Sequence, residues 1–192
     1  VLPLVPTNYG DSPYQSVSST AVNYYLIDFD VLNKKGLLKK CEYQHEVFTY
    51  NKDRVDFGIL FDKKTKILRL AFSRYKPCTR FKKYVKDKES HDFAVFMTIK
   101  SMHNYNAWNY WNKEYRTYSK ELEERVVKEH YDDYLFWVWT QFEFLNEWNK
   151  LHRYALKKGI EIMGDMPLYV AYDSVEVWKH PELFDLNDDR SF

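Results

Sequence analysis

One aspartate stands where α/β proteins place groups that contact their ligands. Residues 160–163 alternate in the manner of a strand, and Asp165 follows them after Gly164. Polar groups at the carboxyl end of a parallel strand contact substrate in proteins of this class, and a carboxylate there can accept hydrogen bonds from ligand hydroxyls. Asp165 is therefore the first candidate for a functional residue. A turn-forming or helix-capping aspartate is the alternative interpretation.

The cysteines and histidines do not form a metal-binding pattern. Cys41 and Cys78 lie 37 positions apart without a C-x-x-C motif, and Cys41 with His45 offers only two ligands on one helix face. We therefore expect no metal and no cofactor. Two cysteines also argue against a disulfide scaffold, so a reducing, cytoplasmic compartment is the expected setting.

Charge and hydropathy exclude several classes of partner. Lys and Arg number 29 against 28 Asp and Glu, so no overall field attracts a nucleic acid or an anionic membrane. No run reaches the roughly 18 apolar residues of a membrane span. We therefore expect no nucleic acid and no membrane partner.

Aromatic residues make up 19% of the chain, which is unusually high. Flat rings can stack on sugars or on bases, so the composition suits a protein that binds flat ligands. An AT-rich genome, which favours Tyr, Phe, Lys and Asn codons, produces the same composition. Composition alone leaves both explanations open.

The elements that must position these residues are predicted from apolar spacing. Gly159 follows Lys157 and Lys158, so a helix is expected to end there before the strand at 160–163. Helix, glycine and strand form an α/β unit, and the predicted fold class is α/β. The other predicted elements are a strand at 1–5 with a turn-rich loop at 6–13, an extended piece at 24–30, and a short helix at 31–40 with Gly36 as its stop. Within 53–90 we expect a helix built on apolar positions between 57 and 72, followed by a charged stretch at 81–89. After these come a helix at 92–103, an irregular aromatic segment at 105–115, and a helix at 122–158 that is broken once.

Several strings in the chain resemble one enzyme family. The most specific are YGDSPYQ, within VLPLVPTNYGDSPYQSVSS (1–19), and GDMPLYVA with the DS and VW that follow it, within 159–186. NYYLIDFDVLNKKGLL (23–38) and segments 54–76, 92–111 and 141–160 follow the family in the same order. On these strings the chain resembles the 4-α-glucanotransferases called amylomaltases or disproportionating enzymes, glycoside hydrolase family 77.

The resemblance implies a partial (β/α)₈ TIM barrel. This chain would supply about strands two and three, separated by a long, mostly helical insertion. Residues 1–30 would hold a barrel strand and a substrate loop, 31–130 the insertion, and 131–192 a barrel helix, strand and second substrate loop. A whole barrel needs at least about 200 residues and eight strands. The chain, which starts without Met and stops in a polar loop, is therefore expected to be a fragment truncated at both ends.

The resemblance also implies a chemistry, the transfer of α-1,4-glucan segments between maltodextrins with retention. One carboxylate forms a glycosyl-enzyme, and a second protonates the leaving oxygen and then activates the acceptor. In the family these groups lie on later strands, as does a third aspartate that stabilises the transition state. We therefore assign no catalytic residue, not even to Asp11, Asp165 or Asp173, and expect this chain to be inactive alone.

Five residues match sugar-binding positions of the family, and their roles are what the resemblance implies. Tyr14 matches the tyrosine that stacks on the donor glucose at the cleavage site. Asp165 matches the aspartate that accepts hydrogen bonds from that glucose, with Ser12 a nearby polar contact. Asp173 is a weaker neighbour on the same loop as Asp165. Tyr9 matches a tyrosine of a secondary glucan site.

Other interpretations stay open at two levels. Tyr14 can alternatively be read as a packing aromatic, and Asp173 as the N-cap of a helix that starts at Val175. At the level of function, the chain could be a non-catalytic α-glucan-binding module that kept the sugar loops without the catalytic strands. A relative of the α-amylases is a third interpretation, and it fits the GDMP and YGDSPYQ strings poorly.

Overall fold

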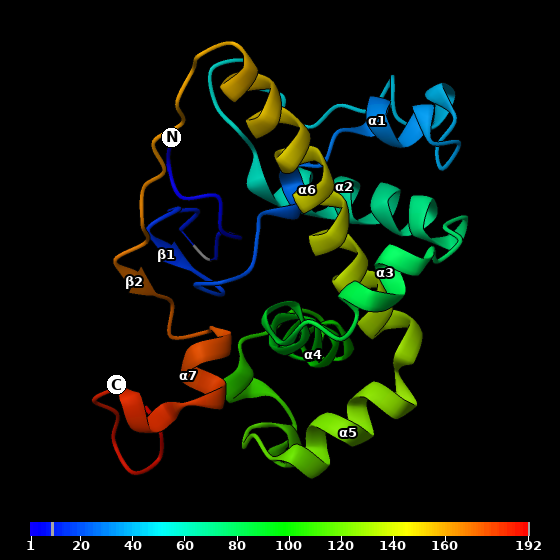
Figure 1. Ribbon diagram of the computed structural model, residues 1–192. Coiled ribbons are helices and arrows are strands. Elements are labelled where there is room, and N and C mark those ends of the chain that lie inside the picture. Colours follow the sequence, from blue (N-terminus) through cyan, green and yellow to red (C-terminus); the bar gives the residue numbers. More distant parts are fainter. Residues whose placement is uncertain (9, 192) are drawn as a thin grey trace.

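The fold is mostly helical, with a small parallel sheet at one side (Figure 1). The computed structural model describes residues 1–8 and 10–191, with residues 88 and 89 described by their backbone alone. The helices are α1 (Phe29–Lys34), α2 (Phe57–Ser73), α3 (Thr79–Tyr84), α4 (Lys88–Met102), α5 (Lys120–Glu129), α6 (Tyr131–Lys157) and α7 (Val175–Lys179). The strands are β1 (Gln15–Ser16) and β2 (Tyr169–Val170), and 3₁₀ turns occupy Tyr24–Leu26, Lys40–Glu42, Trp108–Tyr110, Lys113–Tyr115 and Pro181–Leu183.

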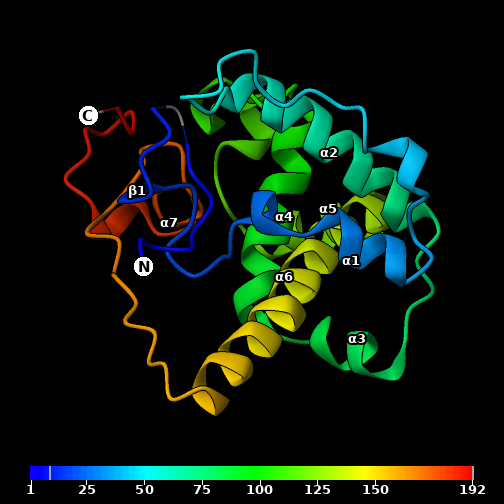
Figure 2. The same cartoon turned by 90° about the horizontal axis from the view of Figure 1, so that it is seen from above.

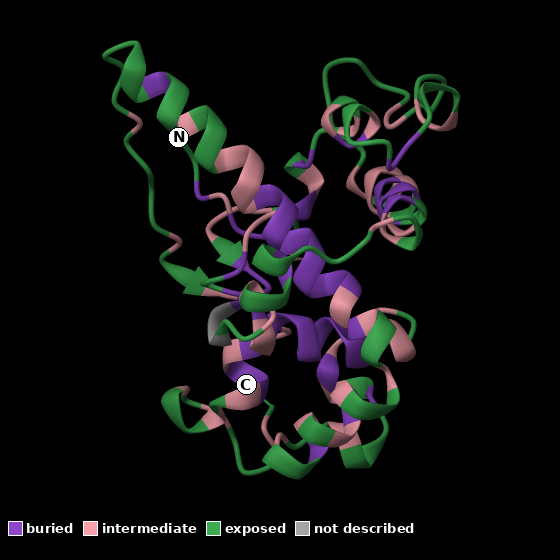
Figure 3. Cartoon of the chain, turned by 45° about the vertical axis from the view of Figure 1, so that its right-hand side comes forward, coloured by how far each residue is buried: buried purple, intermediate pink, exposed green. Residues whose placement is uncertain are grey.

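The core is built around α4 and the first half of α6. Every residue of α4 from 93 to 100 is buried, including the polar Thr98 and Lys100, so this part of the helix is enclosed on all faces. Phe93 of α4 meets Trp137 of α6 edge-on, with ring centroids 6.2 Å apart. The buried segment of α6 runs from Tyr134 to Phe144, whereas its last turns are mostly exposed (Figure 3). The middle of the chain therefore holds the tightest packing.

Glycines end two helices, as predicted. Gly159 has φ +71°, its amide bonds to the carbonyl of Leu156, and the Ile160 amide bonds to the carbonyl of Ala155. This is the Schellman pattern, which needs a left-handed residue just past the helix. Gly36 plays the same part after α1, with φ +74°. Both helix ends could therefore be predicted from a few neighbouring residues.

The longer helical predictions are confirmed, and one local prediction is wrong. Helices cover 57–72 and 92–103 closely, 105–115 is irregular, and the predicted break in the last long helix falls at His130. The segment 24–30 is not extended, because it forms a 3₁₀ turn and then the start of α1. The side chains of Asn23 and Asp28 accept amide hydrogen bonds at the starts of these two elements, so both turns are capped.

The two predicted strands are placed wrongly. Neither 1–5 nor 160–163 forms a strand within the described residues, and only a hydrogen bond from the Val1 ammonium to the Met163 carbonyl, 2.7 Å, joins them. Both segments read as strands because they are apolar or alternating. A strand also requires a hydrogen-bonded partner, and a pattern in one segment does not supply one. Ile160 is 57% and Met163 85% exposed, so most of the apolar surface of this stretch is not packed.

The observed sheet joins segments that are far apart in sequence. Strand β1 pairs with β2 in parallel, with Gln15 opposite Tyr169 and Ser16 opposite Val170. Three further hydrogen bonds, Tyr169 to Tyr14, Ala171 to Ser16 and Val175 to Val17, extend the contact at both ends. Figure 2 shows β1 and α7 on one side of the molecule and α1, α2 and α3 on the other. None of the helices described here is long and apolar enough to cross a membrane.

Candidate functional site

Tyr14 and Asp165, two residues singled out from the sequence, meet in the structure. The phenol hydroxyl of Tyr14 donates a hydrogen bond of 2.7 Å to Oδ2 of Asp165 across 151 positions of sequence. The parallel sheet makes this possible, because the amide of Tyr169 in β2 donates to the carbonyl of Tyr14 at 3.2 Å. The carboxylate is exposed and the tyrosine half-buried, so a ligand can reach both.

The hydrogen bond also affects the pKa of the phenol. Donation to Asp165 raises the pKa of Tyr14, because the carboxylate favours the neutral hydroxyl. A neutral phenol keeps an apolar ring face beside a carboxylate that can accept further hydrogen bonds. This combination suits a ring that has one apolar face and hydroxyls at its edge, as a sugar has.

The segment before Tyr14 is a tight turn. The amide of Asp11 donates to the carbonyl of Asn8 at 2.8 Å, and Gly10 and Asp11 have φ of +96° and +55°. Left-handed backbone suits glycine and is tolerated by aspartate. Ser12 Oγ accepts the Tyr14 amide at 3.3 Å, so its described contact is within the turn. Tyr9, the fifth predicted site residue, lies outside the described residues.

Asp173 faces the helical core, and the reading of it as a helix cap is wrong. Its carboxylate forms an ion pair with Lys100 of α4 and accepts the Trp108 amide at 3.1 Å. The N-cap of α7 is Ser174, whose Oγ accepts the Val177 amide at 3.3 Å. The neighbouring serine can cap because it lies one position nearer to the helix.

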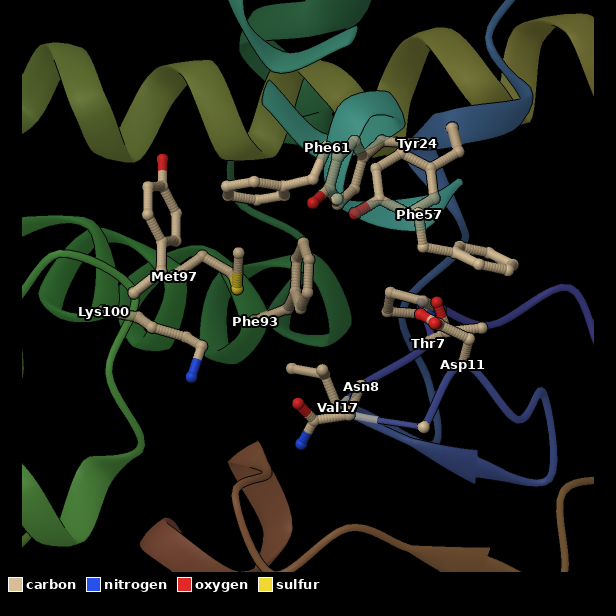
Figure 4. A pocket seen from close by; sticks show the side chains of 15 residues that line it. Thr7, Asn8, Asp11, Val17, Tyr24, Phe57, Phe61, Phe93, Met97 and Lys100 are labelled. Atoms are coloured by element: carbon tan, nitrogen blue, oxygen red, sulfur yellow. The ribbon is translucent and has the colours of Figure 1, made fainter. Parts of the chain in front are cut away.

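A cavity of about 400 Å³ opens beside the 6–11 segment (Figure 4). Its walls combine aromatic rings with a few polar groups, which is the usual character of a small-molecule site. Phe61 and Tyr105 meet edge-on there, with ring centroids 4.7 Å apart. The cavity is lined by Pro6, Thr7, Asn8, Gly10, Asp11, Val17, Tyr24, Tyr25, Phe57, Gly58, Phe61, Phe93, Met97, Lys100 and Tyr105.

The sequence did not predict this cavity. Its lining comes from three separate regions of the chain, within 6–25, 57–61 and 93–105, and the aromatic content was the only signal that pointed toward it. Lys100 and Asn8 stand at one side of the cavity, and Phe57 and Asp11 at another (Figure 4). Partial burial raises the pKa of the Asp11 carboxyl. Charged groups on opposite sides give the cavity distinct polar positions between apolar walls.

A second titratable cluster, also unforeseen, joins α4, α5 and α7. Candidate ligand atoms of His91, Asp92 and Glu123 lie within 4.8 Å of one another. The ammonium of Lys179 already sits among them, 2.5 Å from Asp92 and 4.0 Å from Glu123. His91 is held between Glu123 and the hydroxyl of Tyr134. Two of the three candidate ligands are thus already close to a cation of the protein itself.

Comparisons with known proteins all point to the same enzyme family. The profile of a family described as 4-alpha-glucanotransferase matches residues 1–191. A 4-alpha-glucanotransferase from Clostridium butyricum is 41% identical over 191 residues, covering 97% of this chain and 39% of the relative. One from Thermus thermophilus is 37% identical and covers 98% of this chain and 38% of the relative. The chain thus spans about 39% of the length of these relatives.

A solved structure agrees over the same length. Amylomaltase from Streptococcus agalactiae in complex with acarbose matches with a TM-score of 0.88 and 38% sequence identity. The alignment covers 98% of this chain and 39% of that chain. The mostly helical arrangement and the small parallel sheet are therefore shared with a protein of known structure.

Proposed function

Since this chain belongs to the 4-α-glucanotransferases of glycoside hydrolase family 77, we propose that it supplies donor-sugar loops for an enzyme that transfers α-1,4-glucan segments between maltodextrins. The contact between Tyr14 and Asp165 carries the proposal. It joins one residue from each of the two most specific strings, 151 positions apart, at an accessible surface. The neighbour described in complex with acarbose supports a sugar ligand.

In this proposal the donor glucose lies against the Tyr14–Asp165 pair. The ring of Tyr14 covers the apolar face of the sugar, and the free lone pairs of Asp165 accept hydrogen bonds from its hydroxyls. Because Asp165 Oδ2 already holds the Tyr14 hydroxyl, the ring and the carboxylate approach the sugar as a unit. Direct contacts from Ser12 and Asp173 remain predictions.

The reaction that we propose is a retaining double displacement. One carboxylate attacks the anomeric carbon and the leaving oxygen takes a proton from a second, after which the acceptor hydroxyl reverses both steps. We assign both carboxylates to parts of the longer enzyme outside these 192 residues. The relatives leave room for them, since this chain spans about 39% of their length. The chain alone then binds sugar without transferring it.

We further propose that residues 1–30 and 131–192 each supply one strand, about strands two and three, of a (β/α)₈ barrel. Parallel pairing of segments separated by some 150 residues supports this, because parallel neighbours need a long crossover. The division into 1–30, 31–130 and 131–192 follows the same proposal. Exposed apolar side chains at Met163, Met166 and Leu168 support further strands beside 160–168. A cytoplasmic location completes the proposal.

The aromatic cavity is our proposed place for a secondary glucan contact. Its aromatic rings and polar groups suit a sugar. Its volume of about 400 Å³ matches a short stretch of glucan rather than a whole polymer chain.

The test is disproportionation of maltotriose to glucose and maltopentaose. We expect the longer enzyme that carries this chain to release glucose, and the 192-residue chain to release none while still binding maltodextrin. Glucose release by the chain alone would contradict the assignment of the carboxylates. Binding without release by the longer protein would favour a non-catalytic glucan-binding module.

A further inference from the structure

Asp173 is held by three separate parts of the molecule. Lys100 of α4 forms an ion pair with its carboxylate, and the Trp108 amide, just beyond α4, donates to Oδ1 at 3.1 Å. The backbone carbonyl of Asp173 accepts the side-chain amide of Asn8 at 2.8 Å. One residue therefore ties the 8–14 segment, the segment after β2 and the helical core to each other.

The ion pair is shielded from water. The Lys100 side chain is 8% exposed and that of Asp173 14%, and the ammonium also donates to the Asn106 carbonyl at 3.2 Å. Burying two charges costs desolvation, so such a pair is weak support for stability alone. The Lys100 ammonium is instead held in one orientation, because it donates to both the Asp173 carboxylate and the Asn106 carbonyl.

The contacts of Asp173 and the Tyr14–Asp165 hydrogen bond lie at opposite ends of the same two segments. The 8–14 segment starts at Asn8, which is bonded to Asp173, and ends at Tyr14, which is bonded to Asp165. The segment from 165 to 173 runs between the same two contacts. Both segments are thus joined at both ends, and Lys100 attaches one of those ends to the rigid helix α4.

We propose that Lys100 and Asp173 are positioning residues that set how the 8–14 and 165–173 segments lie, so that Tyr14 and Asp165 meet at the donor sugar. The part of this inference that concerns sugar rests on the proposed function. The part that concerns the two segments does not, because it follows from the contacts alone. Neither residue needs to touch the sugar.

Hydrogen exchange of the chain tests the positioning directly. Asp173→Asn keeps the shape of the side chain and leaves the cavity lining unchanged, whereas Lys100→Met removes the cation. We expect amides in 10–16 and 165–171 to exchange at least about tenfold faster in both variants, and Lys100→Arg to restore most of the protection. Unchanged exchange in Asp173→Asn would overturn the proposal.

The matched control is Lys35→Met. Lys35 forms an ion pair with Glu143, whose side chain is 3% exposed, so this variant also leaves a buried carboxylate without its cation. We expect it to lower the melting temperature without speeding exchange in the two segments. Equal acceleration in the control would reduce the effect to a general loss of stability and would overturn the proposal.

Maltoheptaose affinity, measured by calorimetry on the same variants, separates this inference from the proposed function. We expect Asp173→Asn to bind at least about fivefold more weakly, with faster exchange. Weaker binding with unchanged exchange would make Asp173 a direct sugar contact and overturn positioning. If the unmodified chain binds no maltodextrin while exchange responds as expected, the proposed function fails and the positioning stands.

Discussion

At the scale of single residues, Tyr14 carries two separable contributions. Its ring can cover a sugar, and its hydroxyl orients Asp165 through the 2.7 Å hydrogen bond. We expect Tyr14→Phe to weaken maltoheptaose binding by about fivefold, since an intramolecular hydrogen bond is worth about 1 kcal/mol. Calorimetric titration of the chain measures this. An affinity that stays the same would mean that the hydroxyl has no part in the site.

Lys64 gives a pH dependence whose sign can be worked out. Its ammonium is buried over the ring of Phe29, 3.9 Å from the centroid, and donates to the Ile27 carbonyl. Burial lowers the pKa of Lys64 to about 8 from an ordinary 10.5, with Glu147 and Asp28 opposing the shift in part. Between those values the unfolded chain binds more protons than the folded chain. Stability from this group therefore rises with pH from about 8 to 10.5.

The matching measurement compares Lys64→Met with the unmodified chain in denaturant titrations from pH 7 to about 11. We expect the free energy of unfolding of the unmodified chain to gain up to about 3 kcal/mol relative to the variant over this range. Lys66→Met, on the exposed side of the same helix, serves as the control. The difference in free energy of unfolding between the unmodified chain and Lys66→Met should not change with pH. A difference between the unmodified chain and Lys64→Met that is independent of pH would contradict the lowered pKa.

Residue types and strings predicted part of the site. Tyr14 and Asp165 were found because each stands in a specific string, and the structure brings them together. The cavity and the His91, Asp92 and Glu123 cluster were missed, since their members come from several elements. Nothing in the spacing of Lys100 and Asp173 indicates that they pair. Such contacts depend on tertiary packing, which a single sequence does not display.

At the scale of elements, Gly159 makes the end of α6 testable. Its φ of +71° disfavours any residue with a Cβ, although a Cβ there would meet nothing within 4 Å. We expect Gly159→Ala to lower the free energy of unfolding by about 1 kcal/mol through backbone strain alone. Denaturant titration measures the change.

Gly58, in the first turn of α2, is the matched control. Its φ is not left-handed, and a Cβ there would lie an ordinary 3.5 Å from Asp56 Oδ1. We expect Gly58→Ala to be neutral or to stabilise the chain by about 0.5 kcal/mol, because alanine favours a helix more than glycine does. The same loss in both variants would show that the sign of φ is not the cause.

Elements were predicted unevenly for a physical reason. Helices and their ends depend on residues within a turn or two, so α2, α4 and the stops at Gly36 and Gly159 could be predicted from the sequence, whereas the break in the last long helix was predicted without its position at His130. Strands depend on a partner elsewhere in the chain. The segments 1–5 and 160–163 were therefore wrongly predicted to be strands. The segments that do pair, Gln15–Ser16 and Tyr169–Val170, lie in stretches whose sequence is typical of loops.

At the scale of the whole molecule, one apolar core joins regions far apart in sequence. Phe96 of α4 contacts Trp111 and Trp178, with ring centroids 5.2 and 5.7 Å apart, so α7 and the aromatic segment pack on the same helix. Val17, next to β1, belongs to this core as well. The small sheet that brings Tyr14 to Asp165 is thus attached to the helical core through α4 and α7.

The most direct test of the account is calorimetric titration of maltoheptaose into the 192-residue chain and its Tyr14→Ala variant. Removing the ring deletes the proposed stacking surface, whereas Tyr131→Ala removes a tyrosine that is 50% exposed at the start of α6. We predict saturable binding by the unmodified chain and by Tyr131→Ala, and binding at least about tenfold weaker in Tyr14→Ala. Equal affinity in all three proteins, or no binding by the unmodified chain, would contradict the proposal that Tyr14 and Asp165 form a donor-sugar site.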